Sequence, residues 1–227
     1  MDLADAIRSD IDSFEHIVFD LDNTLYPVDM VPKDIVSPLL SCLHKLNDFK
    51  PRFEAIEIKE IIDDLWNIDF GTVVQKHAIP DNFVQRILEI FDEMRVETHL
   101  SLYEGALETL DLGTSNILVT TGFYNLQMSK IERLGIGHYF QGIYVSDPLL
   151  RGTRNKKGIF EELLAEKVIV AETTLVIGDS FENEISAAID LGLNYYHIKS
   201  KINRFSSSSE QKEEFCKIRG RISRKGD

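Results

Sequence analysis

The sequence predicts an α/β fold, in which a parallel sheet with crossover helices is interrupted by an all-helical insertion. Three observations indicate this fold class. An early apolar run ends in two acids at Asp20 and Asp22, helical periodicity continues from there to about residue 98, and strand and helix patterns alternate from about residue 99. Such alternation is typical of strands joined by helices in a parallel sheet. We therefore expect a Rossmann-like core from residues 1–28 and 99–200 and a helical cap from 29–98.

The first strand is the run from Ile17 to Phe19, whose β-branched and aromatic residues indicate burial on both faces of the sheet. Because side chains alternate along a strand, Asp20 and Asp22 can project to one side of its end, with Leu21 turned away. Two like charges this close favour a bound cation. Ligands collect at the carboxyl ends of strands in open α/β sheets, so this stretch is a candidate reaction centre.

The inserted segment has helical patterning throughout. Apolar residues recur at spacings of three and four over much of residues 29–98. Asp81 follows a proline and is the expected N-cap residue of one of these helices. Phe70, Gly71 and Thr72 break the pattern, so we expect this tripeptide to face the reaction centre and to contribute to substrate specificity.

The remainder of the core is predicted to alternate regularly. The expected strands are 116–119, 143–145, 175–177 and 195–198, and the expected helices are 103–112, a stripe from Leu126 to Leu134 that ends at Gly135, 157–166 and 182–191. The first of these strands leads to Thr120, and the third runs into Gly178 and Asp179.

Composition restricts the function classes. The 227 residues carry a formal net charge of −13, which argues against affinity for a nucleic acid polymer. Residues 201–227 differ, with eight Lys or Arg against four Asp or Glu, and form either a surface tail or an anion-binding arm. Residues 1–14 are a polar lead. No segment approaches the roughly 18 to 20 apolar residues that a membrane helix needs.

The two cysteines favour a reducing location. Cys42 and Cys216 have no partner at the spacing of a metal site or disulfide framework, and the six histidines are scattered. We expect a cytoplasmic protein without a membrane partner, present as a monomer or a homodimer.

The strand-end residues together provide the groups that hydrolysis of a phosphate monoester requires. Asp20 can be the nucleophile, and Asp22 can protonate the departing oxygen and then accept a proton from water. Asp179 adds a third carboxylate, and an oxygen-rich site of this kind suits Mg²⁺. Thr120 can donate its hydroxyl to a phosphate oxygen, and Lys157 can present its ammonium to the anion at the start of a helix.

Several neighbours are expected to support these residues. Thr121 and Gly122 continue the phosphate-binding segment after Thr120. Asn183 and Glu184 begin a helix and can orient the phosphate lysine or a metal-bound water. Lys156 competes with Lys157 for the phosphate-binding role.

In this order, the motifs resemble those of the haloacid dehalogenase superfamily of phosphohydrolases. They are Asp20-Leu21-Asp22-Asn23-Thr24, Thr120-Thr121-Gly122, Lys157-Gly158, and Gly178-Asp179 through Glu184. The resemblance implies that Asp20 is nucleophile and metal ligand. It implies that Asp22 is acid and base and binds the metal through its backbone carbonyl, that Asp179 is a metal ligand, and that the helical insertion is a cap.

The resemblance also suggests a substrate class. The segment 22–27 is similar to that of nucleotidase-like members, so nucleoside 5′-monophosphates come first, followed by sugar phosphates and phosphoglycolate. Two departures from the family pattern are Glu184, where many members have Asp, and the third motif, whose register is open between Lys156 and Lys157.

Three other functions remain open. A dehalogenase would use Asp20 to attack carbon, but it needs no second acid such as Asp22. A phosphomutase of the same superfamily would share every core residue. A non-catalytic binding or regulatory protein would release no phosphate. For the hydrolase, Asp20→Asn is expected to remove turnover and leave the fold intact, because a strand-end Asp is expected to be exposed.

Overall fold

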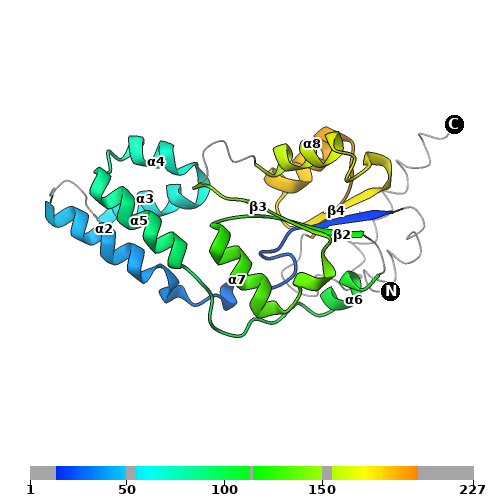
Figure 1. Cartoon of the computed structure of the whole chain (residues 1–227), viewed down its shortest axis with the longest axis horizontal. Coiled ribbons are helices and arrows are strands. Elements are labelled where there is room, and N and C mark those ends of the chain that lie inside the picture. Colours follow the sequence, from blue (N-terminus) through cyan, green and yellow to red (C-terminus); the bar gives the residue numbers. More distant parts are fainter. Residues whose placement is uncertain (1–13, 50–54, 113–114, 150–154, 199–227) are drawn as a thin grey trace.

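The computed structural model describes residues 14–49, 55–112, 115–149 and 155–198. It has two parts, a parallel sheet with flanking helices and a group of helices beside it (Figure 1). Nearly all of the expected polar lead, the basic tail at 201–227 and residues 113–114, which follow the expected helix at 103–112, lie outside the described residues. In the described part of the chain, every helix is too short or too polar to span a bilayer.

The described strands form one five-stranded parallel sheet in the order β3-β2-β1-β4-β5. The strands are β1 (His16–Phe19), β2 (Ser115–Thr121), β3 (Gly142–Ser146), β4 (Thr174–Gly178) and β5 (Asn194–His197). The central strand β1 pairs with β2 and β4, so the carboxyl ends of these three strands meet at one edge. The arrangement confirms the predicted α/β class.

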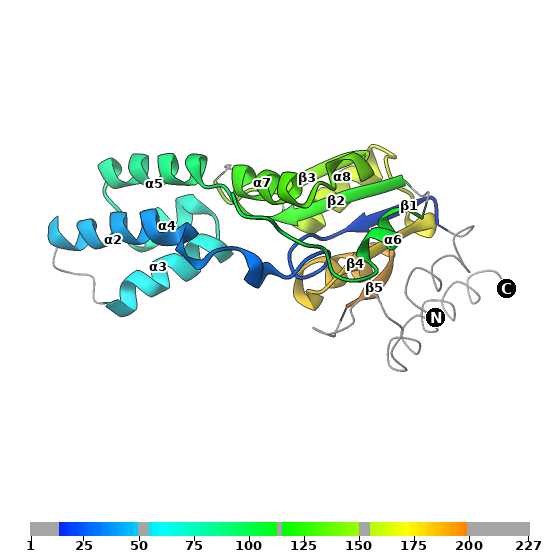
Figure 2. The ribbon, with the colours of Figure 1, turned by 90° about the horizontal axis from the view of Figure 1, so that it is seen from below.

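Both faces of the sheet are covered, as the apolar run in β1 predicts. Ile17 and Phe19 belong to a cluster on one face, which includes α7 (Tyr124–Leu134), whereas Val18 points into a second cluster. The second cluster contains residues of α8 (Lys156–Ala165) and α9 (Ser186–Leu191). In Figure 2, α7 lies beside β2, at the end of the core nearest to the separate group of helices. Because side chains alternate along β1, the strand contributes residues to two apolar clusters.

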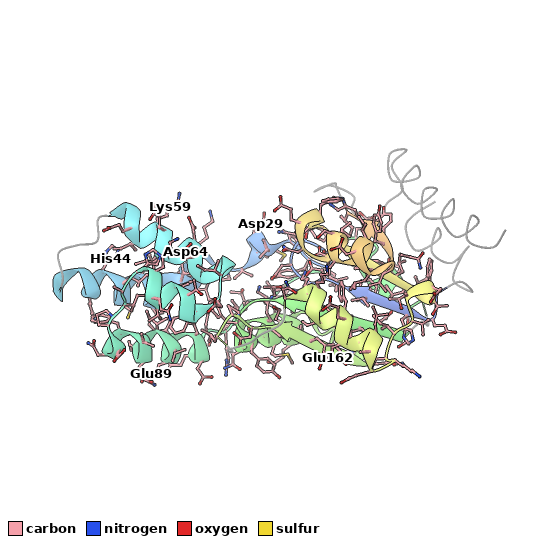
Figure 3. All side chains as sticks on the ribbon, turned by 90° about the horizontal axis from the view of Figure 1, so that it is seen from above. Asp29, His44, Lys59, Asp64, Glu89 and Glu162 are labelled. Atoms are coloured by element: carbon pink, nitrogen blue, oxygen red, sulfur yellow. The ribbon has the colours of Figure 1, made fainter. Side chains whose placement is uncertain are left out.

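All the regular secondary structure in the described residues of the insertion between β1 and β2 is helical, as predicted. It comprises the short turns η2 (Val28–Met30) and η3 (Lys33–Val36) and the helices α2 (Ser37–Phe49), α3 (Ala55–Asn67), α4 (Phe70–Lys76) and α5 (Asp81–Glu93). Figure 3 places Asp29 where the chain passes from the sheet to the insertion, and His44, Lys59 and Glu89 on the helices beyond. Its role as a cap with bounds 29–98 stays a prediction.

The insertion and the sheet share one apolar cluster. Ile61, Val73 and Ile87 of the insertion belong to the same buried cluster as Ile17 of β1. The ring of Phe91 in α5 stacks on Phe123, which precedes α7, with ring centroids 3.7 Å apart. The two parts are therefore joined by continuous packing, which holds one end of the insertion against α7.

Some predicted boundaries differ from the structure. Pro80 is the N-cap residue of α5, and Asp81 lies inside the helix without a capping hydrogen bond, so the N-cap prediction is wrong. The predicted helix at 103–112 is limited to α6 (Ala106–Leu110), because Gly105 before it has a φ of 81°. The predicted helix at 182–191 begins with a π-helical turn, η6 (Phe181–Ile185), and continues as α9.

Two further turns complete the described core. The turn η4 (Gly137–Tyr139) leads from α7 to β3, and η5 (Ala171–Thr173) leads from α8 to β4. Gly135 ends α7 with a φ of 69°, as predicted, because glycine adopts the left-handed conformation without steric cost.

Candidate active site

Asp20 leaves β1 at the centre of the sheet edge and is held on both carboxylate oxygens. Its Oδ1 accepts a hydrogen bond from Lys156 Nζ at 2.5 Å, and its Oδ2 accepts one from Thr24 Oγ1 at 2.9 Å. Asn23 takes a φ of 56°, a conformation that Asn tolerates, and the loop thereby turns Thr24 back toward Asp20. Asp20 is only 6% exposed, so the expectation of an exposed strand-end Asp is wrong.

Three carboxylates gather at this position. Ligand oxygens of Asp20, Asp179 and Glu184 all lie within 4.8 Å of one another. Lys156 Nζ also donates to Glu184 Oε2 at 2.7 Å, and the backbone N–H of Ser180 donates to Glu184 Oε1 at 2.7 Å. The structure thus brings together the predicted ligands Asp20 and Asp179 and adds Glu184 to them.

Gly178 makes room for the third carboxylate. A Cβ atom at this position would lie 2.3 Å from Glu184 Oε1 and 2.4 Å from Glu184 Cγ, closer than atoms can pack. The π-helical turn η6 carries Glu184 back over the strand end, and such turns are frequent at functional sites. The glycine before Asp179 therefore serves this close approach.

The electrostatics of the cluster suit a divalent cation. Burial raises the pKa of Asp20 to about 7, the charge of Lys156 opposes the rise and that of Glu184 adds to it. Burial would lower the pKa of Lys156, but the charges of Asp20 and Glu184 raise it above its ordinary value. Three carboxylates around one ammonium have an excess of two negative charges when ionised, and oxygen ligands are those that Mg²⁺ prefers. The residues present thus fit a single Mg²⁺ ion.

The two adjacent lysines lie in different environments. Lys156 is buried between Asp20 and Glu184, whereas Lys157 Nζ pairs with Asp190 Oδ2 at 2.7 Å on the surface. The side chains of that surface pair are 42% and 57% exposed. The structure therefore places Lys156, and not the predicted Lys157, against the candidate nucleophile.

Asp22 has its own set of partners. Its carboxylate accepts hydrogen bonds from Lys130 Nζ at 2.8 and 2.9 Å, from Gln127 Nε2 at 3.0 Å and from Tyr26 Oη at 2.5 Å. Burial acts to raise the pKa of Asp22, but the charge of Lys130 and these hydrogen bonds outweigh it and hold the pKa below its ordinary value. The carboxylate is outside the three-acid cluster, and metal binding through the Asp22 carbonyl stays a prediction.

The partners of Asp22 on α7 were not among the predicted site residues. Gln127 and Lys130 lie among the apolar positions that defined this helix, and both are buried. Polar residues three positions apart share a helix face, which was the available signal. Gln127 Nε2 also donates to Thr120 Oγ1 at 2.7 Å and so connects the predicted phosphate-binding hydroxyl to Asp22.

The segment after Thr120 turns sharply away from the sheet. Gly122 has a φ of 144°, and its N–H donates to the Ser146 carbonyl at 3.1 Å. Thr121 lines a cavity of about 330 Å³ that also contacts Lys156 and Asn183. Asn183 also lines the cavity, and its Nδ2 donates to Ser180 Oγ at 2.9 Å. Its predicted role in orienting the phosphate lysine or a metal-bound water stays a prediction.

The cavity lies between the insertion and the core. Its lining residues from the insertion are Ile68 and Asp69, and those from the core are Thr121, Ser146, Pro148, Asn155, Lys156, Lys157, Glu182, Asn183, Ser186 and Ala187. Phe70, Gly71 and Thr72 are not among them. They form the first turn of α4, where Asp69 caps the helix through the N–H of Thr72 at 3.0 Å. The predicted break in helical structure thus lies at residues 68–69, and specificity at 70–72 stays a prediction.

Comparisons with solved structures agree with this fold. A haloacid dehalogenase-like family hydrolase from Xanthomonas campestris aligns over 94% of each chain, with a TM-score of 0.55 and 18% identity. A predicted phosphoglycolate phosphatase from Haemophilus somnus 129pt aligns over 82% of this chain and 86% of its own, with a TM-score of 0.57 and 21% identity. A 2-haloacid dehalogenase from Pseudomonas syringae covers 80% and 85%, with a TM-score of 0.51 and 18% identity. These likenesses show the shared fold.

The sequence comparison assigns the family. No curated protein matches the chain. The sequence profile of haloacid dehalogenase-like hydrolases, however, matches residues 17–198, a span that contains every strand-end residue described above. The resemblance predicted from the four motifs is confirmed, and the chain belongs to the haloacid dehalogenase-like hydrolase family.

Proposed function

We propose that the protein is a Mg²⁺-dependent phosphatase that hydrolyses a small phosphorylated metabolite through an aspartyl-phosphate on Asp20. The observation that carries the proposal is the buried contact of Asp20 with Lys156, next to Asp179 and Glu184. A nucleophilic carboxylate, a cation for the transferring group and a separate acid and base in Asp22 are the parts that phosphoryl transfer requires.

In the first step, an oxygen of Asp20 attacks phosphorus and the bond from phosphorus to the leaving oxygen breaks. Substrate phosphate is negatively charged, so its binding favours the protonated form of Asp22, whose pKa is lowered in the free site. Asp22 then gives its proton to that oxygen, and the product leaves as an alcohol. Lys156 neutralises charge on the transferring phosphoryl group, and the hydroxyl of Thr120 can donate to one of its oxygens. The phosphoryl group is then bound to Asp20.

In the second step, water attacks the phosphorus of the aspartyl-phosphate. The Asp22 carboxylate accepts a proton from this water, and the bond from phosphorus to Asp20 breaks. Inorganic phosphate and the original carboxylate of Asp20 result, with Asp22 protonated for the next turnover.

Asp20, Asp179 and Glu184 are the residues that would hold the magnesium ion. When bound, Mg²⁺ neutralises negative charge on the carboxylates and on the phosphate group. The excess negative charge of the three acids over Lys156 supports this assignment. Cys42 is a free buried thiol, which fits the cytoplasmic location that we include in the proposal.

The insertion is proposed to act as a cap that selects the leaving group. The cavity of about 330 Å³ is lined from both the insertion and the core, which supports this role and a small substrate. Nucleoside 5′-monophosphates are the first candidates, on the similarity of segment 22–27 to nucleotidase-like proteins. Sugar phosphates and phosphoglycolate follow, and the name of the Haemophilus relative is a reason to screen phosphoglycolate.

The test is a phosphate-release screen over these substrates with Mg²⁺ and with EDTA, run beside Asp20→Asn. We expect release that depends on Mg²⁺ and is lost in the variant. Residual activity of Asp20→Asn equal to wild type would exclude Asp20 as the nucleophile. Conversion of a hexose 1-phosphate to the 6-phosphate without free phosphate would instead establish a mutase. Absence of any phosphate release would leave a binding or regulatory role.

A further inference from the structure

Two buried polar side chains on α7 reach the sheet edge. Gln127 is 1% exposed and Lys130 is 5% exposed, although both residue types are mostly found in contact with water. Burial of a lysine requires a compensating partner, and Lys130 Nζ contacts both carboxylate oxygens of Asp22. The helix therefore directs a charge at a residue of the proposed reaction.

The amide of Gln127 faces three acceptors. Its Nε2 donates to Asp22 Oδ2 at 3.0 Å, to Thr120 Oγ1 at 2.7 Å and to the Thr121 carbonyl at 2.7 Å. Its Oε1 has no hydrogen-bond partner among the described residues. Turning the amide over would bring Oε1 against the carboxylate and the carbonyl, so its orientation is fixed. Stability alone does not explain a buried amide that is satisfied at one end only.

The local backbone accommodates this amide. A Cβ atom at Gly122 would lie 3.1 Å from both Cδ and Nε2 of Gln127, tighter than ordinary packing. The backbone at Gly122 also has a φ of 144°, a conformation that residues other than glycine rarely adopt. The glycine after the Thr120-Thr121 pair thus leaves the space in which Gln127 reaches Asp22.

We propose that Gln127 and Lys130 are positioning residues. They hold the carboxylate of Asp22 at a fixed position relative to Thr120, both when Asp22 protonates the leaving oxygen and when it accepts a proton from water. The proposal rests on the phosphatase function proposed above. Because Thr120 Oγ1 accepts the amide N–H, its own hydrogen is directed away from Gln127 and can be donated to a phosphoryl oxygen. One amide then fixes the spacing between the group that binds the phosphoryl oxygen and the group that carries the proton.

The test compares leaving groups in the Lys130→Met variant with Mg²⁺ present. p-Nitrophenolate leaves without protonation, so Asp20 should still be phosphorylated by p-nitrophenyl phosphate, while attack by water is slowed. We expect a burst of about one p-nitrophenolate per active site and then a steady rate at least ~10-fold below wild type. An alkyl phosphate needs the proton from Asp22 in the first step, so its single-turnover rate should fall ~100-fold. With excess alkyl phosphate, no burst of the alcohol should be seen.

Control variants separate positioning from folding. Lys130→Arg keeps the charge and should restore most of the activity. Arg133→Met removes another cation from α7, one that donates to the Val96 carbonyl at 3.2 Å, and should change neither rate. Gln127→Met keeps the side-chain volume and should also show the burst, so the test does not depend on Lys130→Met alone. Thermal unfolding checks that each variant is folded.

Two results would overturn the inference. If a folded Lys130→Met or Gln127→Met loses the same factor on both substrates and shows no burst, the α7 residues have a structural role only. If wild-type protein releases phosphate from no monoester, the proposed function itself fails. The first result leaves the phosphatase proposal intact, so the two failures are distinguishable.

Discussion

Replacement of Lys156 by Met tests the centre of the proposed site. The side chain is 7% exposed, and its Nζ lies 2.5 Å from Asp20 Oδ1 and 2.7 Å from Glu184 Oε2. Methionine keeps much of the length and the apolar stem of lysine but removes the charge. Asp20 and Glu184 then face one another without the cation that joins them.

The expected magnitudes follow from burial. Removing one partner of a buried ion pair costs about 3–5 kcal/mol of the free energy of unfolding. Loss of a positive charge that contacts the transferring group lowers kcat by a factor of about 10² to 10³. The matched control is Lys157→Met, because Lys157 is the neighbouring lysine and its pair with Asp190 is solvent-exposed. An exposed pair of this kind contributes about 0–1 kcal/mol.

Two measurements decide the outcome. Urea unfolding in EDTA gives the free energy of unfolding of each variant without a metal ion, and phosphate release with saturating Mg²⁺ gives kcat. We expect Lys156→Met to lower both the free energy of unfolding and kcat much more than Lys157→Met does. The reverse order, or equal losses, would show that the lysine assignment taken from the structure is wrong.

Three further outcomes are expected. Asp20→Asn should abolish phosphate release and destabilise the protein less than Lys156→Met in urea, because Lys156 keeps Glu184 as a counter-ion; a larger loss of stability would contradict this. In EDTA, the free energy of unfolding of wild type relative to Asp20→Asn should fall as the pH rises from about 4 to about 7. The pKa of Asp20 is raised from 3.8 to about 7, so over this range the folded state retains a proton on Asp20 that the unfolded state releases. A pH-independent difference in urea titrations would refute the shift. Gly178→Ala should displace Glu184, weaken Mg²⁺ binding measured by calorimetry and cost about 1–3 kcal/mol. Its control Gly137→Ala, with Cβ 3.6 Å from Ile131 Cγ2, should change neither quantity.

The strand ends were predictable because each is marked twice in the sequence. An apolar run defines the strand, and the polar residue directly after it marks the carboxyl end, as at Asp20 and Asp179. Parallel pairing then brings these ends to one edge whatever the order of the strands. Helical periodicity likewise identified the insertion, because its apolar residues recur at the spacing of one helix face.

The choice between Lys156 and Lys157 could not be made from the sequence. Adjacent residues on a helix point roughly 100° apart, so a shift of one residue exchanges a buried lysine for a surface one. Both residues are lysine, and the orientation of α8 depends on its packing against the sheet. A similar limit applied at Gly71, where glycine suggested a break but the cap formed by Asp69 begins a helix.

The two acids at the end of β1 illustrate why spacing alone does not assign roles. Asp20 and Asp22 are identical residues two positions apart, yet burial raises the pKa of Asp20, and Lys130 with its neighbours more than offsets burial at Asp22. In the free site these shifts favour a protonated Asp20 and an ionised Asp22, so the proposed roles need the charges of Mg²⁺ and of the substrate phosphate to reverse them. The two acids also have partners on opposite faces of the sheet, because Lys156 is on α8 and Lys130 is on α7. The division of labour therefore depends on both layers of helices, which the first motif alone does not encode.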